Sequence, residues 1–417
     1  MNSSQPVTQQ PARGQVWLAI ATCFLVATIE GYDIQILAIA APKFAPELGF
    51  DSSALGWIFG AVSFGIMIGS SFGGRAGDVF GHRIVLSSAL LTFGLFTLLT
   101  PFCQSFESFL IVRMLTGIGF GVALPNLMSM AANISTDKST FRTNAAVFWG
   151  VPLGAVVAAG LFSQGMNWQM AFFGGGTAAL ACIPLVLLSF TGKRPARTEP
   201  ETMKESFLRQ LLSDKYRNQS LLIWVIFALA YLVSYFASVW LPMIVSGKGF
   251  TPETAASVML AYGIFGMIGI FAVGWACDQF GYQIPVTLCW IAIVPVLMFT
   301  ALSSDWLTLH IIGALTGFLV NGGVFALYSV AAAGYPVHLR GAGSGAALAW
   351  ARFGAILGPL TGGWLLNTNL SQIYIMGVFA IIALTTASFV FVSGFVLKSR
   401  PAASTLPPKP KAHAPGH

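Results

Sequence analysis

Four charged side chains lie inside long apolar segments of a chain in which charge is otherwise rare. Glu30 and Asp33 stand three residues apart in one apolar segment, while Arg113 and Arg352 each interrupt another. A charge in such a segment is costly unless it is paired or faces a polar interior, so it commonly marks a functional site. These four residues are therefore the first candidates for chemistry.

The two acids have the depth that a proton-binding site in a membrane requires. If a helix starts near Trp17, a rise of 1.5 Å per residue places Glu30 roughly 20 Å and Asp33 roughly 24 Å along it. Burial favours the protonated form of a carboxyl group, so we predict that Asp33, helped by Glu30, carries protons, with Arg113 as a partner. The alternative is a carboxylate that only pairs with a basic residue to fix helix packing.

Arg352 lies near the middle of its apolar segment, about 13 residues or 20 Å from the start. A guanidinium group pairs with a carboxylate through two parallel hydrogen bonds, which predicts a site for an organic anion. In this interpretation Arg352 faces Glu30 and Asp33. The alternative is a permanent ion pair between Arg352 and one of these acids.

A substrate with a ring needs apolar and aromatic walls with a few placed polar groups. The aromatic candidates near mid-depth are Tyr32, Trp149, Tyr231, Tyr235, Tyr262, Tyr328 and Trp350, and Asn126 and Asn321 are candidate amide donors. Most aromatic residues in membrane helices face lipid or pack against neighbours, so each candidate competes with that ordinary role.

A short polar loop separates two apolar segments and reads Gly-Arg-Ala-Gly-Asp-Val-Phe-Gly-His-Arg from Gly74 to Arg83. Gly81 can adopt the backbone angles of a tight turn, and Asp78 can accept hydrogen bonds from a helix N-terminus or pair with a cation. We predict that Gly74, Asp78, Gly81 and Arg83 form a conformational latch, together with Asp278 in the second half.

These residues must be positioned by helices that cross a membrane. Of the 417 residues, 56% are hydrophobic and only 8% are charged, which excludes a soluble globular chain and a disordered one. A span needs about 20 apolar residues. The segments that qualify are 17–40, 54–76, 84–103, 107–134, 141–163, 168–190, 219–246, 252–277, 284–302, 306–334, 339–366 and 372–397.

The fold class predicted from these segments is an all-α integral membrane protein with twelve transmembrane helices in two pseudo-symmetric six-helix bundles. Residues 17–190 form the first bundle and residues 219–398 the second. Between them, the polar segment 191–218 is a cytoplasmic loop whose Lys204–Tyr216 part could form an amphipathic surface helix. Residues 1–16 form an N-terminal tail, and the Pro-rich, basic residues 399–417 form a disordered tail.

An internal repeat with a constant offset supports the division into halves. Matches in register on several helix pairs indicate duplication, and an even number of spans per half gives both halves the same orientation. The matches are Met67-Ile68-Gly69 with Met267-Ile268-Gly269, Gly74, Asp78 and Gly81 with Gly274, Asp278 and Gly281, Leu115-Thr116-Gly117 with Leu315-Thr316-Gly317, and Gly154-Ala155 with Gly354-Ala355.

The basic residues predict the orientation. Of the 21 Lys and Arg residues, 17 fall on the side of both termini, and only Lys43 and Lys248 fall on the opposite side. An excess of basic residues marks the cytoplasmic side, so both termini are expected there. The net charge of +7 thus reports topology and gives no reason to expect a nucleic-acid partner.

Other function classes lack their signatures. The five cysteines lie in apolar segments without metal-ligand spacing, and the sequence contains no GxSxG, HExxH or Walker A motif. We therefore predict no metal, no cofactor and no enzymatic activity. A sensor with a transporter-like body would need a soluble domain, and the short tails leave no room for one. A monomer in the lipid bilayer is expected.

One loop and three helix motifs resemble those of a known family. The loop at Asp78 resembles the signature loop of major facilitator transporters, although Gly77 replaces the usual Ala. The first-helix acids are similar to those of the aromatic acid:proton symporter family, with Glu30 in place of the usual Asp. The motifs are Glu30-Gly31-Tyr32-Asp33, Arg113-Met114-Leu115-Thr116-Gly117 with Ala123-Leu124-Pro125-Asn126-Leu127, and Arg352-Phe353-Gly354-Ala355 with Gly358-Pro359.

The second motif resembles helix four of the 3-(3-hydroxyphenyl)propionate transporter branch of that family, and the third is similar to helix eleven of the family. The likeness runs from about Trp17 to Arg400. The resemblance implies a proton-coupled importer of aromatic carboxylates in a bacterial inner membrane. The second-half loop departs from the pattern, because Gln283 stands where the first loop has Arg83. The alternative within transporters is proton-driven export of drugs or organic acids.

Overall fold

The computed structural model describes residues 13–134, 147, 149–189, 207–336 and 339–398. In the first half the elements are α1 Arg13–Leu48, α2 Ser52–Phe80, α3 His82–Leu99, the 3-10 turn η1 Thr100–Phe102, α4 Phe106–Ile134, α6 Gly150–Ser163 and α7 Trp168–Ser189. The second half follows with α8 Phe207–Leu211, α9 Arg217–Gly247, α10 Pro252–Phe280, α11 Gln283–Leu302, α12 Trp306–Gly334, α13 Arg340–Leu366 and α14 Gln372–Lys398.

The described residues form only helices, as predicted. Ten of these helices are long and apolar enough to cross a membrane. The shorter apolar helix α6 and the Arg-containing helix α13 account for the other two predicted spans. Most of the N-terminal tail, the start of the fifth span, most of the central segment and the C-terminal tail lie outside the described residues.

Several helix boundaries differ from those expected from the sequence. The first helix continues to Leu48, beyond the predicted end at residue 40, because it accommodates Pro42 and Pro46. In the described part of the central segment, helix α8 covers Phe207–Leu211 and therefore ends before Tyr216, where the predicted surface helix ends. Helix α9 begins at Arg217, inside the segment assigned to the loop.

The ends of equivalent helices use the same devices in both halves. Gly49 and Gly249, which are related by the offset of the sequence repeat, have positive φ angles of 71° and 91°. Just after them, the side chain of Asp51 accepts a hydrogen bond from the Ala54 N–H at the start of α2. Thr251 caps α10 in the same way. Each cap satisfies a backbone donor that the helix itself leaves free.

Close helix packing also repeats with the offset of the sequence. A Cβ on Gly154 would collide with the Thr28 carbonyl, and a Cβ on Gly354 would collide with the Ala228 carbonyl. Gly117 and Gly317 lie equally close to the backbones of α2 and α10. In lipid the hydrophobic effect does not drive apolar helices together, so their association depends on close packing. Small residues such as these glycines allow the backbones to approach closely enough for that packing.

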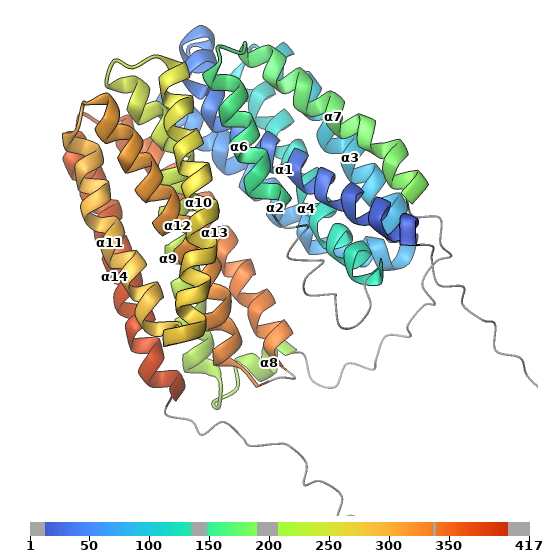
Figure 1. The fold of residues 1–417 in the computed structure, drawn as a ribbon, viewed down its shortest axis with the longest axis vertical. Helices are drawn as coiled ribbons and strands as arrows, with labels where there is room; N and C mark the ends of the chain where they lie inside the picture. Colours follow the sequence, from blue (N-terminus) through green and yellow to red (C-terminus); the bar gives the residue numbers. More distant parts are fainter. Residues whose placement is uncertain (1–12, 135–146, 148, 190–206, 337–338, 399–417) are drawn as a thin grey trace, which may run out of the picture.

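The two halves touch at one end and diverge toward the other. Figure 1 shows the first half, blue to green, and the second half, yellow to red, leaning together at one end and separating toward the end that carries α8. The cross-half contacts lie near the touching end, where Gly56 of α2 meets the Pro359 backbone of α13 and Gly363 meets Ser52. Helices α6 and α10 stay in contact further along.

Candidate functional site

Arg352 lies on α13, one to two turns before the residues of that helix that contact the first half. It is partly exposed on α13, one turn before Ile356, whose carbonyl lies near Gly60 of α2. A separation of four residues places Arg352 and Ile356 on the same face of the helix, so Arg352 is directed toward the first half. The pattern of the sequence predicted its depth, and the packing of α13 supplies its direction.

Glu30 is the acid on which the positive charge of Arg352 acts. Its side chain on α1 is buried, with 5% of the residue exposed, and Oε2 has no hydrogen-bond partner. Arg352 acts on it electrostatically from the other half, although no ion pair joins the two among the described residues. A guanidinium group of the second half therefore influences a buried carboxyl group of the first half without an ion pair between them.

Asp33 does not share this position. Its Oδ2 lies 3.5 Å from Nη1 of Arg113, and both residues are 1% exposed within the first half. Arg113 also donates to the Thr100 hydroxyl and lies over the Phe172 ring at 5.1 Å. The expectation that Arg352 faces both acids is thus corrected, since only Glu30 is placed opposite it. Asp33 is paired with Arg113 of α4, whereas Oε2 of Glu30 has no hydrogen-bond partner, so the two acidic side chains meet different surroundings although they lie three residues apart.

Asn126 and Tyr32 are occupied within the first half. The Asn126 amide donates to the carbonyls of Gly73 and Val122, and its oxygen lies 2.8 Å from His82 Nδ1. The Tyr32 hydroxyl donates to the Ala171 carbonyl of α7. Both residues are buried and hydrogen-bonded within the first half, and their contact with substrate stays a prediction.

The other predicted ring contacts lie on or near facing helices. Trp149 stacks on Phe271 of α10 with 4.2 Å between ring centroids, so it joins the halves. Trp350 stacks on Trp224 within the second half. Tyr235 lies over Tyr231, and Asn321 donates to the Gly317 carbonyl one turn earlier on α12 and is a neighbour of Gly266.

The predicted loop at Asp78 is helical, which corrects the sequence interpretation. Gly74 and Asp78 lie in the last two turns of α2, Arg83 lies in the first turn of α3, and Gly81 alone forms the turn between the helices. The Asp78 side chain is 76% exposed and lies 3.5 Å from His82 Nε2, and Asp278 is exposed as well. Gly81 has the positive φ, 94°, that its turn requires. Local packing explains why residue 77 is glycine, since a Cβ there would collide with Asn126 and His82. Sequence reasoning gave His82 no role.

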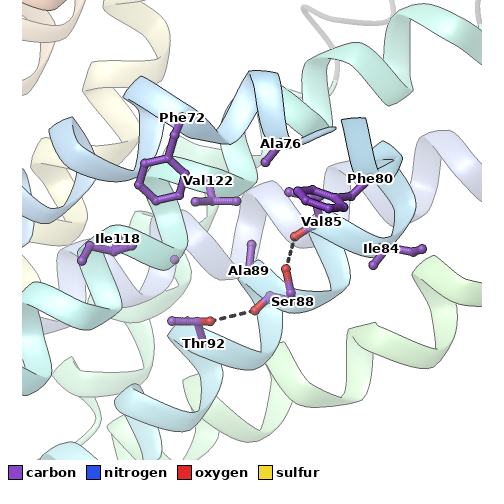
Figure 2. A pocket seen from close by; sticks show the side chains of 11 residues that line it. Phe72, Ala76, Phe80, Ile84, Val85, Ser88, Ala89, Thr92, Ile118 and Val122 are labelled. Atoms are coloured by element: carbon purple, nitrogen blue, oxygen red, sulfur yellow. Dashed lines mark hydrogen bonds between the residues drawn. The ribbon is translucent and has the colours of Figure 1, made fainter. Parts of the chain in front are cut away.

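A separate apolar cavity of about 420 Å³ lies between α2, α3 and α4 (Figure 2). Phe72, Phe80 and Ile84 line it, and no charged residue does. The hydroxyls of Ser88 and Thr92 already donate to carbonyls of α3 itself, as Figure 2 shows. The cavity therefore offers nothing to hold an anion and is not the site built around Arg352.

One ion pair crosses the halves at the touching end, and sequence reasoning missed it. Nζ of Lys43 on α1 lies 2.7 Å from Oε1 of Glu253 on α10. The ammonium group also donates to the Met166 carbonyl and lies over the Phe162 ring at 4.8 Å. Among the residues that the structure describes, the remaining ion pairs join residues of a single half.

Removing this ion pair should favour separation of the touching ends. We expect Lys43→Gln and Glu253→Gln each to increase the separated population roughly 2- to 5-fold, the range for a partly exposed ion pair. Spin labels at Gln104 and Ser304, exposed residues of the two halves, would report the distance. Lys248→Gln is the matched control, because Lys248 donates to Ala301 within its own half. Equal populations in all variants would show that the ion pair does not hold the halves.

Comparisons with known proteins agree with the helical architecture. The sequence model of the Major Facilitator Superfamily matches residues 23–304 and 249–416 of this chain. The chain is 30% identical to the 3-(3-hydroxy-phenyl)propionate transporter of Escherichia coli (strain K12), over 94% of this chain and 96% of that protein. It is 28% identical to a 4-hydroxybenzoate transporter of Acinetobacter baylyi, covering 94% and 93%, and 26% identical to the gallate transporter of Pseudomonas putida, covering 95% and 96%.

Solved structures show the same fold at low sequence identity. A bacterial homologue of the human lysosomal transporter Spinster, in an inward-facing and unoccupied conformation, superposes with a TM-score of 0.77 at 14% identity, covering 94% of this chain and all of that one. A D-xylose-proton symporter gives a TM-score of 0.69 at 14% identity, covering 90% and 97%. These likenesses concern the fold alone.

Proposed function

Because the chain belongs to the Major Facilitator Superfamily, we propose that it imports aromatic carboxylates together with protons across a bacterial inner membrane. The family and the curated relatives are transporters, so the chain is a multi-pass membrane transporter and not an enzyme. The names of the relatives support aromatic acids as the substrate class. The direction of transport and the coupling to protons are the parts that we add.

The observation that supports the proposal is the electrostatic influence of Arg352 on the buried Glu30 of the other half. Arg352 is partly exposed and makes no ion pair in the described part of the chain, so its guanidinium is free to take a substrate carboxylate. Midway between two repeated halves is also where transporters of this architecture bind their substrates. The aromatic side chains of α9, α12 and α13 supply walls for a ring.

Proton coupling follows from the competition between two carboxylates for one cation. While Glu30 is ionised it attracts Arg352, and a substrate anion at the same place would be repelled. Once Glu30 takes up a proton, the guanidinium group is available and the substrate carboxylate replaces it as the counter-charge. Anion and proton would then enter and leave together, which is symport. Asp33 and Arg113, one turn deeper, form the second member of the proton-coupling set.

The proposed orientation places the diverging end of the halves in the cytoplasm. Helix α8, which contains Arg209, lies at that end in Figure 1, as the charge bias of membrane proteins requires. In this orientation the touching ends of the halves face the outside, the diverging ends face the cytoplasm, and both termini are cytoplasmic. We propose that the monomer is the transporting unit.

Binding to the purified wild-type protein tests the substrate class. We expect calorimetry to detect 4-hydroxybenzoate, benzoate or 3-(3-hydroxyphenyl)propionate, and to detect no binding of the corresponding amides, which lack the negative charge. Acetate serves as a control for an acid without a ring. Binding of the amides as tightly as the acids would contradict a site built on Arg352.

Asp78 is expected to act in the opposite conformation, when the cytoplasmic ends close. Asp78→Asn keeps the size of the side chain but removes charge-assisted hydrogen bonds, each worth roughly 1.5–3 kcal/mol. Because that side chain is exposed in the present state, transport should fall about tenfold or more while folding is retained. Asp214→Asn, at another exposed ion pair, is the control. Normal uptake by the Asp78 variant would remove the latch role.

A further inference from the structure

A histidine ring joins two polar groups at the turn between α2 and α3. Nδ1 of His82, the first residue of α3, lies 2.8 Å from Oδ1 of Asn126 on α4. Nε2 of the same ring lies 3.5 Å from Oδ1 of Asp78, which stands one turn earlier near the end of α2. The ring therefore lies between the bundle interior and the exposed acid to which the latch role is assigned.

The Asn126 amide determines which nitrogen of the ring carries a proton. Nδ2 of Asn126 donates to the carbonyls of Gly73 and Val122, each at 2.8 Å, so both N–H groups of the amide are used. Oδ1 can only accept, and Nδ1 of His82 must therefore be the donor. With that proton held on Nδ1, a neutral ring has a lone pair at Nε2, whereas a charged ring has an N–H group there.

Asp78 thus meets a different group according to the charge of the ring. An ionised carboxylate only accepts hydrogen bonds, so it gains none from the lone pair of a neutral His82. A charged ring offers it a charge-assisted hydrogen bond. The His82 side chain is 11% exposed while that of Asp78 is 76% exposed, so the ring is held in the bundle and the acid is free to leave it.

Residue 77 makes room for this arrangement. A Cβ on Gly77 would collide with Oδ1 of Asn126 and with Nδ1 of His82, so the hydrogen bond between them requires glycine. The second half keeps the acid as Asp278, but the residues equivalent to Gly77, His82 and Asn126 are Cys277, Tyr282 and Ala326. The packing of the repeated fold therefore does not require the group, which points to a role of its own in the first half.

Asp78 is the acid nearest to the ring on the helices that pack around it. The charged residues of α2 and α3 beside the turn are Asp78, Arg75 and Arg83. In α4, Glu107 and Arg113 lie at least 13 residues before Asn126, which is about 20 Å along the helix. Helix α7 also packs on α3, and its titratable side chain, Cys182, is buried.

We propose that His82 is a positioning residue that controls the latch through its own charge. The charged ring holds Asp78 beside α3 while the cytoplasmic ends are apart, and the neutral ring releases Asp78 for its contact in the closed state. This inference rests on the proposed function, because it takes Asp78 as the latch and its end of the molecule as cytoplasmic. Since each imported acid brings a proton, acidification of the cytoplasm delays closure and slows further import.

The test measures the separation of the cytoplasmic ends at different pH values by spin-label distances. Labels at Leu188, near the end of α7, and at Asn218, at the start of α9, lie on exposed residues of the two halves. His82→Asn keeps an N–H group near the position of Nδ1 and has no second group to reach Asp78. His310→Asn is the matched control, because the His310 ring contacts Ser257 at the touching end.

Between about pH 8 and about pH 5, histidine changes charge. Over this interval we expect the ratio of separated to closed molecules to rise in wild type roughly 2- to 5-fold more than in His82→Asn, the range for a partly exposed ion pair. Glu30 and other acids also titrate, so the difference between the two proteins is the measured quantity. The control His310→Asn should respond as wild type does.

Asp78→Asn provides a second, independent variant, because it keeps His82 and its hydrogen bond to Asn126. It should lose the same part of the pH response, and adding His82→Asn to it should change nothing further, since the ring acts through that acid. Equal pH responses of wild type and His82→Asn, or an undiminished effect of His82→Asn in the Asp78→Asn protein, would overturn the inference. The measurement uses no substrate, so this failure is distinct from a failure to bind aromatic acids, which would reject the proposed function.

Discussion

Arg352→Ala is expected to abolish binding of aromatic carboxylates and therefore their uptake. A guanidinium group and a carboxylate form two charge-assisted hydrogen bonds, each worth roughly 1.5–3 kcal/mol, so the affinity should fall at least about 100-fold. Arg352→Lys keeps the charge but loses the planar fork, and its affinity should lie between those of wild type and the alanine variant. Calorimetry on purified protein measures both.

Two controls separate this effect from general damage. Arg217→Ala removes an exposed guanidinium that lies 3.8 Å from Asp214 and should leave binding unchanged. The Arg352 variants should also remain folded, because no ion pair in the described residues depends on that side chain. Undiminished binding of 4-hydroxybenzoate by the alanine variant would exclude Arg352 from the substrate site.

Glu30→Gln is expected to separate transport from accumulation. The amide cannot release a proton, so the variant should exchange labelled for unlabelled substrate across the membrane but no longer accumulate it against a gradient. Counterflow and proton-driven uptake in proteoliposomes measure these two activities separately. Retained accumulation by the variant would place the proton site elsewhere.

Asp33→Asn is also expected to abolish accumulation, but it carries a structural risk. The substitution leaves Arg113 charged and buried without its acid, which in other proteins costs about 3–5 kcal/mol. The double variant Asp33→Asn/Arg113→Gln removes both charges and should restore folding. If the double variant folds and still accumulates substrate, Asp33 and Arg113 serve packing and not coupling.

The sequence predicts the architecture well because one-dimensional signals control it. Apolar length sets the spans, and the offset of the sequence repeat reappears in the glycine contacts at Gly154 and Gly354. Helix ends are harder to predict, because a membrane helix can continue through Pro42 and Pro46 when its neighbours compensate. The four embedded charges were recognisable in the same way, since each breaks an apolar segment.

The direction of side chains around each helix could not be read from the sequence. Depth follows from counting residues, but whether Asp33 meets Arg113 or Arg352 depends on which helices are neighbours. Asn126 was a plausible amide donor by depth, yet its group is used between α2 and α4. The pair Lys43–Glu253 joins residues from different halves of the chain, and only the docking of the halves brings them together.

Proton-linked accumulation is the measurement that tests the central claim most directly. Proteoliposomes containing the purified protein would be given a pH difference, acid on the side of the Lys43–Glu253 contact, with labelled 4-hydroxybenzoate outside. We predict concentrative uptake that collapses when a protonophore removes the pH difference, and that is absent with Glu30→Gln. Accumulation that persists without the pH difference, or substrate extrusion driven by inward proton flow, would contradict symport and indicate a different mechanism.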